Sequence, residues 1–232
     1  GSGMGCPDWP KCFGYYIPPT QESELLFQAE RDYEKGQVII VDESLKVAKS
    51  DFTSAEHYNP KNWENYTRHD YAVFNPAHTW TEYINRLVGA LAGFAVLIMA
   101  VLSFRKWKTR KRLCILSWLS VFLMVFQAWL GATVVYSVLA PVRITLHMVM
   151  ALVIVAILLY ILADSSAKIY AFKVSKSFKA VVLVSIILSL IQVILGTQVR
   201  QFVDEQVKVL GYGTRDLWLN NPEISFYIHR SF

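Results

Sequence analysis

The sequence predicts an all-α integral membrane protein, a helical bundle with four complete transmembrane helices and the start of a fifth. The 232-residue chain is 54% hydrophobic, and its apolar residues gather in long runs of the length that crosses a bilayer. Residues 1–80 hold 7 Lys and Arg against 12 Asp and Glu, whereas residues 81–232 hold 16 against 6. A polar, acidic first third followed by apolar runs with basic clusters is typical of a membrane protein with one large segment outside the bilayer.

Four apolar stretches are long enough to span, since a spanning helix needs about 20 mostly apolar residues. They are 83–104, 113–136, 143–163 and 179–199, and a fifth stretch starts at about residue 224. The net charge of +5 comes from basic residues that lie between these runs. Because those residues do not line one soluble face, we expect the lipid bilayer as partner and no nucleic acid.

The charges of the connecting loops predict the orientation of the helices. The segment RKWKTRKR at 105–112 carries six positive charges and no acid, and the loop 164–179 carries four lysines against one acid (Lys168, Lys173, Lys176, Lys179; Asp164). Cytoplasmic loops are rich in Lys and Arg. Residues 1–80, the turn at Ala140 and the loop 200–223 are therefore expected on the outside of a multi-pass protein.

Two cysteines of the outer segment, Cys6 and Cys12, are separated by a short stretch that contains two prolines. On the oxidising side of the membrane such a pair predicts a disulfide, with a free redox pair or a metal site as alternatives. No other Cys or His stands close enough in sequence to complete a zinc set. Cys114 is expected to be a small buried apolar residue, and residues 38–52 are expected to form a hairpin.

Ionisable residues at membrane depth mark candidate functional positions, because they are costly there. Glu82, Asn85 and Arg86 share one face of the first helix, as an interfacial ion pair or as part of a site. His147 lies among apolar residues in the third helix, and His229 opens the fifth. Imidazole is a common ligand of heme iron and of other metals, although a lone histidine is also a frequent hydrogen-bonded packing residue.

Two short echoes suggest a duplicated helical bundle. Tyr83-Ile84-Asn85-Arg86 matches Tyr227-Ile228-His229-Arg230, which makes His229 the counterpart of Asn85. Gln127-x-x-Leu130-Gly131 matches Gln192-x-x-Leu195-Gly196 near the outer ends of two other helices. The glycines of these helices serve close helix packing or leave room for a flat ligand.

The motifs GSGMGCPDWPKC, TWTEYINR, QAWLGATVVY, LHMVMAL, LGTQVRQF and YIHR resemble the heme A synthase family, in order along the whole chain. The long outer segment is similar to that of members from bacteria of the Bacteroidetes type. The resemblance implies an oxidoreductase of the bacterial inner membrane, with eight helices in two four-helix halves. Such an enzyme oxidises the C8 methyl of heme O to a formyl group, giving heme A for cytochrome c oxidase. It implies heme b as cofactor, heme O as substrate, and heme O synthase and oxidase assembly factors as partners.

Compared with that family, the chain is expected to be a fragment that lacks the first helix, most of the sixth and the last two. Residues 1–80 would form an outer segment, and 81–163 the transmembrane helices of the first half. Residues 164–178 would form a cytoplasmic loop, and 179–232 the start of the second half.

The resemblance also implies roles for individual residues. His147 and His229 match axial ligands of heme iron, and Glu82 matches a glutamate implicated in the chemistry. Asn85 stands where the family motif has a further histidine, beside Arg86. Either the first half is a substrate site with five-coordinate iron, or another residue such as His78 fills in. Heme propionates are expected to pair with arginine (Arg86 or Arg200), and Arg230 matches the arginine of the same motif.

Two other functions fit the composition and topology. A di-heme b electron carrier would use the same histidines without needing Glu82. A heme-free assembly or transport protein would use the polar residues only for helix packing.

Overall fold

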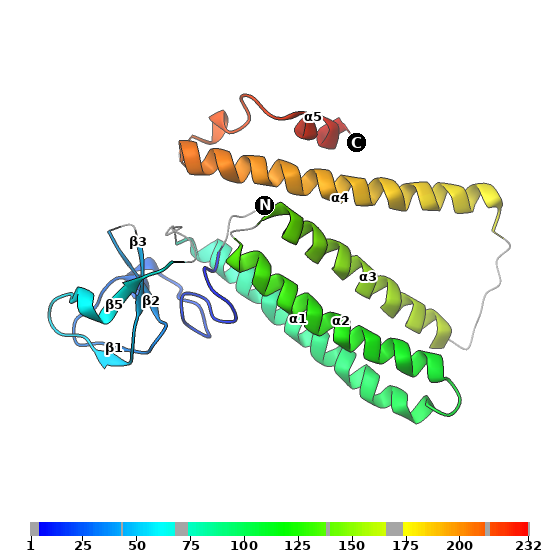
Figure 1. Cartoon of the computed structure of the whole chain (residues 1–232), viewed down its shortest axis with the longest axis horizontal. Helices are drawn as coiled ribbons and strands as arrows, with labels where there is room; N and C mark the ends of the chain where they lie inside the picture. The colour runs from blue at the N-terminus through cyan, green and yellow to red at the C-terminus, as the bar shows by residue number, and fades with distance from the viewer. Residues whose placement is uncertain are drawn as a thin grey trace. The chain divides into compact units, whose positions relative to one another are not determined.

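The computed structural model of the chain describes residues 5–42, 44–67, 74–137, 140–165, 174–211 and 214–231. It is mostly helical (Figure 1), with α1 (Pro76–Ser103), α2 (Lys111–Tyr136), α3 (Pro141–Ser165), α4 (Lys176–Leu210) and the short α5 (Ile224–Ser231). Helices α1 to α4 are each long and apolar enough to cross a membrane. The predicted all-α, multi-pass membrane fold is therefore confirmed.

Local capping sets where these helices begin. Helix α1 starts with Pro76, whose fixed φ suits the first helical position, and the Asn75 side chain accepts the N–H of His78 at 3.2 Å. Helix α4 starts after Ser175, whose hydroxyl accepts the N–H of Phe178 at 3.1 Å. Because of such caps, α1 and α4 begin several residues before the apolar stretches do.

Helix α4 also runs eleven residues past its predicted end at residue 199 and ends at Leu210, before Gly211. The added turns are polar, and side chains four residues apart support them. Arg200 forms an ion pair with Asp204 at 3.6 Å, and Gln201 donates to Glu205 at 2.8 Å. The first part of the predicted loop 200–223 is therefore helical.

The spanning helices turn large apolar side chains outward, as the 65% exposure of Phe94 and the 63% exposure of Leu91 and Val181 illustrate. Such surfaces are stable against lipid tails rather than water. Small polar side chains lie inside, where hydroxyls bond to backbone carbonyls (Ser103, Ser117, Ser120). Cys114 is buried and free, as expected, and its thiol donates to the Ser103 carbonyl at 2.7 Å.

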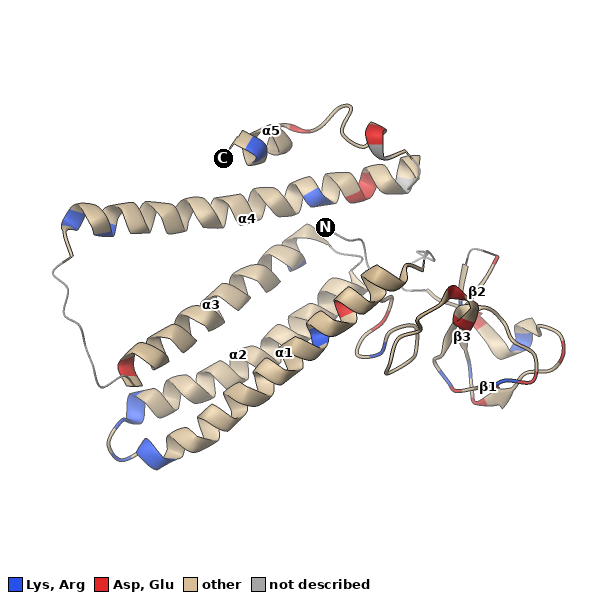
Figure 2. Cartoon of the chain, turned by 180° about the vertical axis from the view of Figure 1, so that it is seen from behind, with Lys and Arg blue, Asp and Glu red and all other residues tan. Residues whose placement is uncertain are grey.

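Basic residues gather at the turn between α1 and α2 (Figure 2), which includes the 3₁₀ helix η3 (Phe104–Lys106). Arg110 of this turn donates to the carbonyl of Asp164 at the end of α3, at 2.6 Å. Lys168 and Lys173, which also entered the orientation argument, lie outside the described residues. The sidedness of the membrane stays a prediction.

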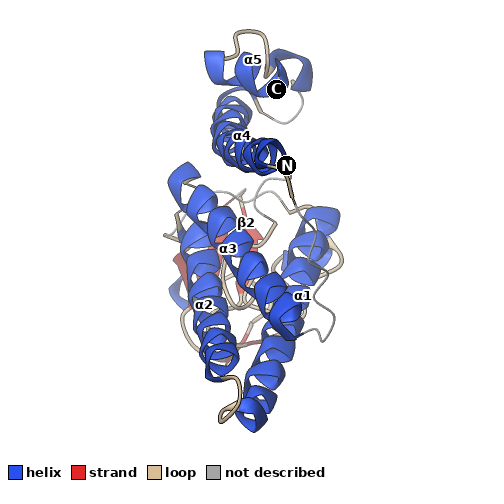
Figure 3. Cartoon of the chain, turned by 90° about the vertical axis from the view of Figure 1, so that its right-hand side faces the viewer, coloured by secondary structure: helices blue, strands red, loops and turns tan. Residues whose placement is uncertain are grey.

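The chain divides into two compact units. The N-terminal unit comprises Ser2–Leu91 with Val135–Val138, and the helical unit comprises Ala92–Val134 with Leu139–Phe232. The N-terminal unit holds all the strands of the described residues (Figure 3), in a small module that the sequence did not predict beyond one hairpin.

This β-module contains five short strands: β1 (Asp32–Tyr33), β2 (Val38–Val41), β3 (Ser44–Ala48), β4 (Phe52–Thr53) and β5 (Trp63–Asn65), with the 3₁₀ helices η1 (Glu22–Leu25) and η2 (Pro60–Asn62). Strands β2 and β3 pair antiparallel from Val38↔Val47 to Val41↔Ser44, which confirms the expected hairpin. The sheet order is β2-β3-β5, and β1 pairs with β4 in a second sheet.

Both faces of β2 are buried. Val38 packs in a cluster with the disulfide and apolar residues around it (Cys6, Cys12, Phe13, Leu25, Leu45). The next residue, Ile39, points to the opposite face and packs in an aromatic cluster (Tyr33, Ala48, Trp63). One face of the sheet thus packs on the disulfide, and the opposite face packs on the aromatic cluster.

Trp63 is central to the aromatic cluster. Its ring meets those of Tyr33 and Phe52 edge-on at centroid distances of 5.0 and 5.4 Å. We expect Trp63→Ala to lower the free energy of unfolding of the β-module by about 3–5 kcal/mol, because it removes a buried aromatic ring.

Limited proteolysis of the purified protein measures this loss as faster cleavage within residues 20–67. Leu26→Ala is the control, because that side chain is 46% exposed and should change stability by no more than about 0.5 kcal/mol. Equal cleavage rates for the two variants would contradict the prediction.

Candidate functional site

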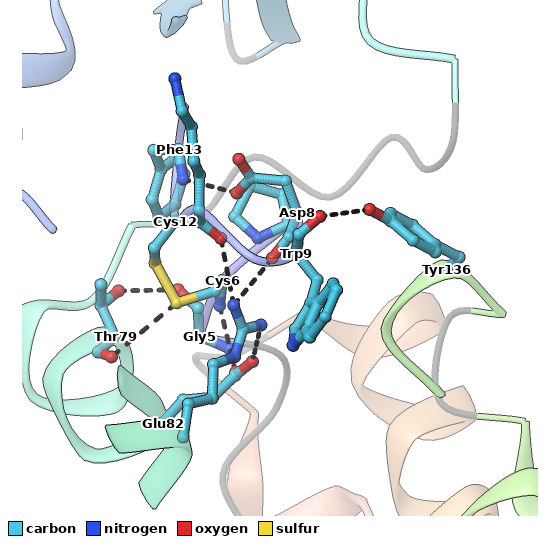
Figure 4. A network of polar contacts seen from close by, with 12 residues as sticks. Gly5, Cys6, Asp8, Trp9, Cys12, Phe13, Thr79, Glu82 and Tyr136 are labelled. Atoms are coloured by element: carbon cyan, nitrogen blue, oxygen red, sulfur yellow. Dashed lines mark hydrogen bonds and ion pairs between the residues drawn. A yellow bond between two sulfur atoms is a disulfide. The ribbon is translucent and has the colours of Figure 1, made fainter. Parts of the chain in front are cut away.

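The first candidate site is the disulfide loop, residues Gly5–Gly14, which the Cys6–Cys12 bond closes with an S–S distance of 2.01 Å. The Glu82 side chain of α1 binds the start of this loop (Figure 4). Oε2 of Glu82 accepts the backbone N–H of Gly5 at 2.8 Å and of Cys6 at 3.1 Å. The predicted disulfide is therefore present, and the predicted catalytic glutamate is bonded to the same loop.

Arg86, one helical turn after Glu82, holds the other side of the loop. Its Nη1 donates to the carbonyls of Asp8 at 2.9 Å and Lys11 at 3.0 Å, and its Nη2 donates to Oε1 of Glu82. The two side chains are only 17% and 26% exposed. A hydrogen bond to a charged group contributes about 1.5–3 kcal/mol to stability. This pair therefore stabilises the loop more than an exposed ion pair would.

The start of α1 and the loop touch closely. The buried Thr79 hydroxyl donates to the Gly5 carbonyl at 2.8 Å. A Cβ on Gly5 would lie 2.5 Å from the His78 carbonyl oxygen, so only glycine fits there. Trp80 adds a contact from its indole N–H to the Pro19 carbonyl at 3.2 Å.

The loop is also bonded within itself and to the end of α2. The Asp8 carboxylate accepts the N–H of Phe13 at 2.6 Å and of Gly14 at 2.8 Å. Burial raises the pKa of Asp8 above its usual value, although these N–H donors and Arg86 act in the opposite direction. The Tyr136 hydroxyl donates to the Trp9 carbonyl (Figure 4).

A separate candidate site lies in the helical unit, where α2 supports His147 of α3. The Gln127 side chain donates through Nε2 to the backbone carbonyl of His147 at 2.9 Å. One turn along α2, a Cβ on Gly131 would lie 3.3 Å from Cε1 of the imidazole. The ring therefore lies over a glycine, and its Nδ1 is buried without a hydrogen-bond partner among the described residues.

The same arrangement recurs between α4 and α5. Gln192 donates through Nε2 to the backbone carbonyl of His229 at 2.8 Å. A Cβ on Gly196 would lie 3.1 Å from Cε1 of that imidazole, and Nδ1 is again buried without a partner. The echo between the two Gln-x-x-Leu-Gly segments thus corresponds to two like histidine sites.

These surroundings fit heme better than a bare metal ion. Within the described ranges, no group of three or more His, Cys, Asp and Glu side chains could hold a metal ion. Heme iron needs only one or two protein ligands, because the macrocycle supplies the others. The glycines leave room for each imidazole ring, and each ring has a second nitrogen, Nε2, that could bind heme iron while Nδ1 keeps its proton.

The other residues predicted from the sequence to bind heme lie in several places. Asn85 and Arg230 are exposed, and Arg200 pairs with Asp204. His78 is half-buried and lies seven residues before Asn85, about 10 Å along the helix axis. That separation disfavours His78 as a substitute ligand at the Asn85 position.

The sequence did not reveal three sets of contacts. Gln127 and Gln192 were visible as an echo but not as partners of the histidines. The Thr145 and Thr197 hydroxyls bond to each other at 2.8 Å and join α3 to α4. Asp8, Thr79 and Tyr136 lie within the motifs quoted above, but nothing in the sequence indicated that they hold the disulfide loop.

The chain is similar to known proteins. A family model described as cytochrome oxidase assembly protein (COX15-CtaA) matches residues 39–221. A heme A synthase of Shewanella oneidensis is 25% identical over 197 residues, which are 84% of this chain and 48% of that protein. A heme A synthase of Shouchella clausii is 31% identical over 130 residues, 54% of this chain and 43% of that protein. The chain thus spans less than half the length of these curated relatives. No solved structure matches it.

The close approach of Gly5 to α1 gives a testable prediction. Gly5→Ala should weaken the seating of the disulfide loop by about 1–3 kcal/mol, because its Cβ overlaps backbone that cannot move aside. The measurement is the rate at which a reductant opens the Cys6–Cys12 bond, followed by labelling of the new thiols, and we expect it to rise.

Gly89→Ala is the matched control, since a Cβ there meets nothing within 4 Å. Reduction of that variant should proceed as in the wild type. Slow, unchanged reduction of the Gly5→Ala variant would show that the loop does not depend on this contact.

Proposed function

Because the chain belongs to the COX15-CtaA family of cytochrome oxidase assembly proteins, we propose that it is a heme A synthase. In this proposal it oxidises the C8 methyl of heme O to a formyl group, and the product, heme A, serves cytochrome c oxidase. The observation that carries the proposal is the pair of like histidine sites, each with a glutamine on the histidine backbone and a glycine under the ring. The relatives' name, heme A synthase, supports the product, and the resemblance of the motifs to that family supports the reaction.

In this proposal, His147 would hold the iron of the substrate heme O, and His229 would hold the iron of heme b. When bound, heme b would supply one-electron redox chemistry. Asn85 offers only a carboxamide, which is a poor iron ligand, so the position of the family's further histidine would add no strong ligand.

Glu82 is proposed to stabilise positive charge that develops at the methyl carbon. A fixed carboxylate in a site that excludes water acts on such charge far more strongly than it does in water. Its two oxygens accept bonds from Gly5, Cys6 and Arg86, and an ionised carboxylate has about four acceptor positions. The loop would therefore fix the direction of the carboxylate without using up its capacity.

Among the arginines, we propose Arg200 for the heme propionates. The guanidinium of Arg86 is already bonded to Glu82 and to two loop carbonyls, and its part would be to hold the loop. Arg230, directly after His229, would contribute on the heme b side.

The proposed setting is the bacterial inner membrane, with residues 1–80 and 200–223 outside. Residues 81–163 would form helices of the first half, 164–178 a cytoplasmic loop and 179–232 the start of the second half. Heme O synthase would deliver the substrate, and oxidase assembly factors would receive the product.

A di-heme b electron carrier is the second candidate, and the likeness of the two histidine sites favours it. Such a carrier needs two similar heme sites and no specialised one. A heme-free assembly or transport protein explains the sites less well, because it gives no role to two histidines that are each supported by a glutamine and a glycine.

Product analysis distinguishes these functions. The full-length gene product is co-expressed with a heme O synthase, and extracted hemes are separated by chromatography with mass detection. We expect heme A or its hydroxylated precursor. Bound heme b with unmodified heme O would instead indicate the electron carrier, and protein without heme would indicate the third candidate.

Glu82→Gln tests the role of the carboxylate. The amide oxygen still accepts the N–H groups of the loop, but the negative charge and the acceptor for Arg86 are gone. We expect product formation to fall by about a hundredfold to a thousandfold, while bound heme b stays as in the wild type and the disulfide resists reduction at least as well as in the Thr79→Val variant.

Thr79→Val is the companion variant, because it removes a loop contact, the bond to the Gly5 carbonyl, and leaves the carboxylate unchanged. It reports how far loosening of the loop alone lowers activity. If Glu82→Gln keeps full activity, or loses it only together with the loop as Thr79→Val does, then Glu82 is structural.

A further inference from the structure

The two histidine sites share one feature that the proposed function does not explain. At each site, the glutamine lies on the helix that precedes the histidine helix, and its amide bonds to the histidine backbone. We propose that Gln127 and Gln192 are equivalent positioning residues, each fixing the place and the ring tautomer of an axial histidine. This inference rests on the proposed heme binding by His147 and His229.

Each glutamine bonds to the backbone of its histidine. The His147 carbonyl lies inside α3, where it already has a partner four residues along the helix, so the bond from Nε2 of Gln127 at 2.9 Å is an addition. The His229 carbonyl lies in the last turn of α5, where carbonyls have no partner within the helix, and Nε2 of Gln192 serves it at 2.8 Å. Such interhelical bonds contribute about 0.6–2 kcal/mol. They fix the depth and rotation at which each imidazole stands.

Each site also contains two buried side-chain atoms that have no hydrogen-bond partner among the described residues. In both sites, the buried side-chain atoms without a hydrogen bond are the glutamine Oε1 and the histidine Nδ1. One is an acceptor, and the other is a donor whenever the imidazole binds iron through Nε2. Ligating histidines usually give that second N–H to an acceptor, which sets their orientation and basicity.

The same amide therefore has the chemistry to serve both groups of one histidine. Its Nε2 already bonds to the backbone of that residue, and its Oε1 is an acceptor without a partner among the described residues. The glycine one turn further along the glutamine helix leaves the ring room to settle, since a Cβ would lie 3.3 Å from Cε1 of His147 and 3.1 Å from Cε1 of His229. The arrangement occurs twice with the same atoms, which argues against a chance contact.

The test uses two kinds of variant. Gln127→Met and Gln192→Met keep the side-chain length and lose both polar groups. Gln127→Glu and Gln192→Glu keep an acceptor. All are made in the full-length gene product and purified with heme bound. The readouts are the rate of heme transfer to apomyoglobin, the electron paramagnetic resonance spectrum and the midpoint potential. Gln201→Met is the control, since Gln201 is exposed on α4 and bonds to Glu205.

We expect each Met variant to lose heme from its own site roughly tenfold to a hundredfold faster, with altered resonance positions, and the control to match the wild type. Each Glu variant loses the bond to the histidine backbone but keeps an acceptor for Nδ1–H. It should therefore lose heme more slowly than the Met variant at the same site and show a lower midpoint potential than the wild type, because an anionic acceptor makes the imidazole a stronger donor to iron. Met variants with wild-type heme transfer and spectra would overturn the inference, as would Glu variants with an unchanged potential.

The outcomes separate this inference from the proposed function. If the wild-type protein holds no heme, the proposed function fails, and the glutamines have no ligand to position. If the wild type holds heme and produces heme A while the glutamine variants are indistinguishable from it, only the positioning role fails.

Discussion

The bonding of Glu82 and Arg86 to the backbone of the disulfide loop is the interaction on which the N-terminal unit depends. Backbone N–H and C=O groups need partners wherever water is scarce. The loop has too few residues to satisfy its own groups by regular structure, so side chains of α1 do so instead. Two N–H groups go to the carboxylate, and two carbonyls go to the guanidinium.

This interaction links layers of the N-terminal unit that would otherwise be separate. The disulfide packs on one face of β2 through Val38, and the other face of β2 carries the aromatic cluster around Trp63. The β-module is thus attached to the disulfide loop, and the loop is attached to the first turns of α1. Because the bonds run through one ion pair, the geometry of Glu82 depends on a correctly closed loop. The disulfide and the glutamate belong to one structural unit, whatever chemistry the carboxylate performs.

Much of the helical fold could be predicted from the sequence, because it follows from length and hydropathy. The four runs that start near residues 83, 113, 143 and 179 could be buried only in a bilayer, and each became a helix. The helix ends were harder, since they depend on caps such as Asn75 and Ser175 and on pairs such as Arg200 with Asp204. Those features add polar turns that a hydropathy argument does not count.

The β-module and the contacts of the sites could be predicted only in part. The hairpin at 38–48 shows in its run of β-branched residues, but β1, β4 and β5 are two or three residues long and exist only through pairing with distant segments. Glu82 with Arg86 follows from helical spacing alone. Its bonds to Gly5 and Lys11 do not, because they join segments more than seventy residues apart.

The histidine sites combine likeness with one asymmetry. Glutamine, glycine and histidine recur with the same contacts on α2–α3 and on α4–α5, and the Thr145–Thr197 bond joins the middle two of these helices. Thr145 precedes His147 by two residues, and Thr197 directly follows Gly196, so a shift of one site moves the helix that supports the other. By contrast, Asn85 occupies the position that matches His229 in the echo of YINR with YIHR. Under the proposed function, two sites built alike but with different further ligands would suit a protein in which one heme remains and the other reacts and leaves. The likeness would then serve binding, and Asn85 in place of a histidine would serve the difference in chemistry.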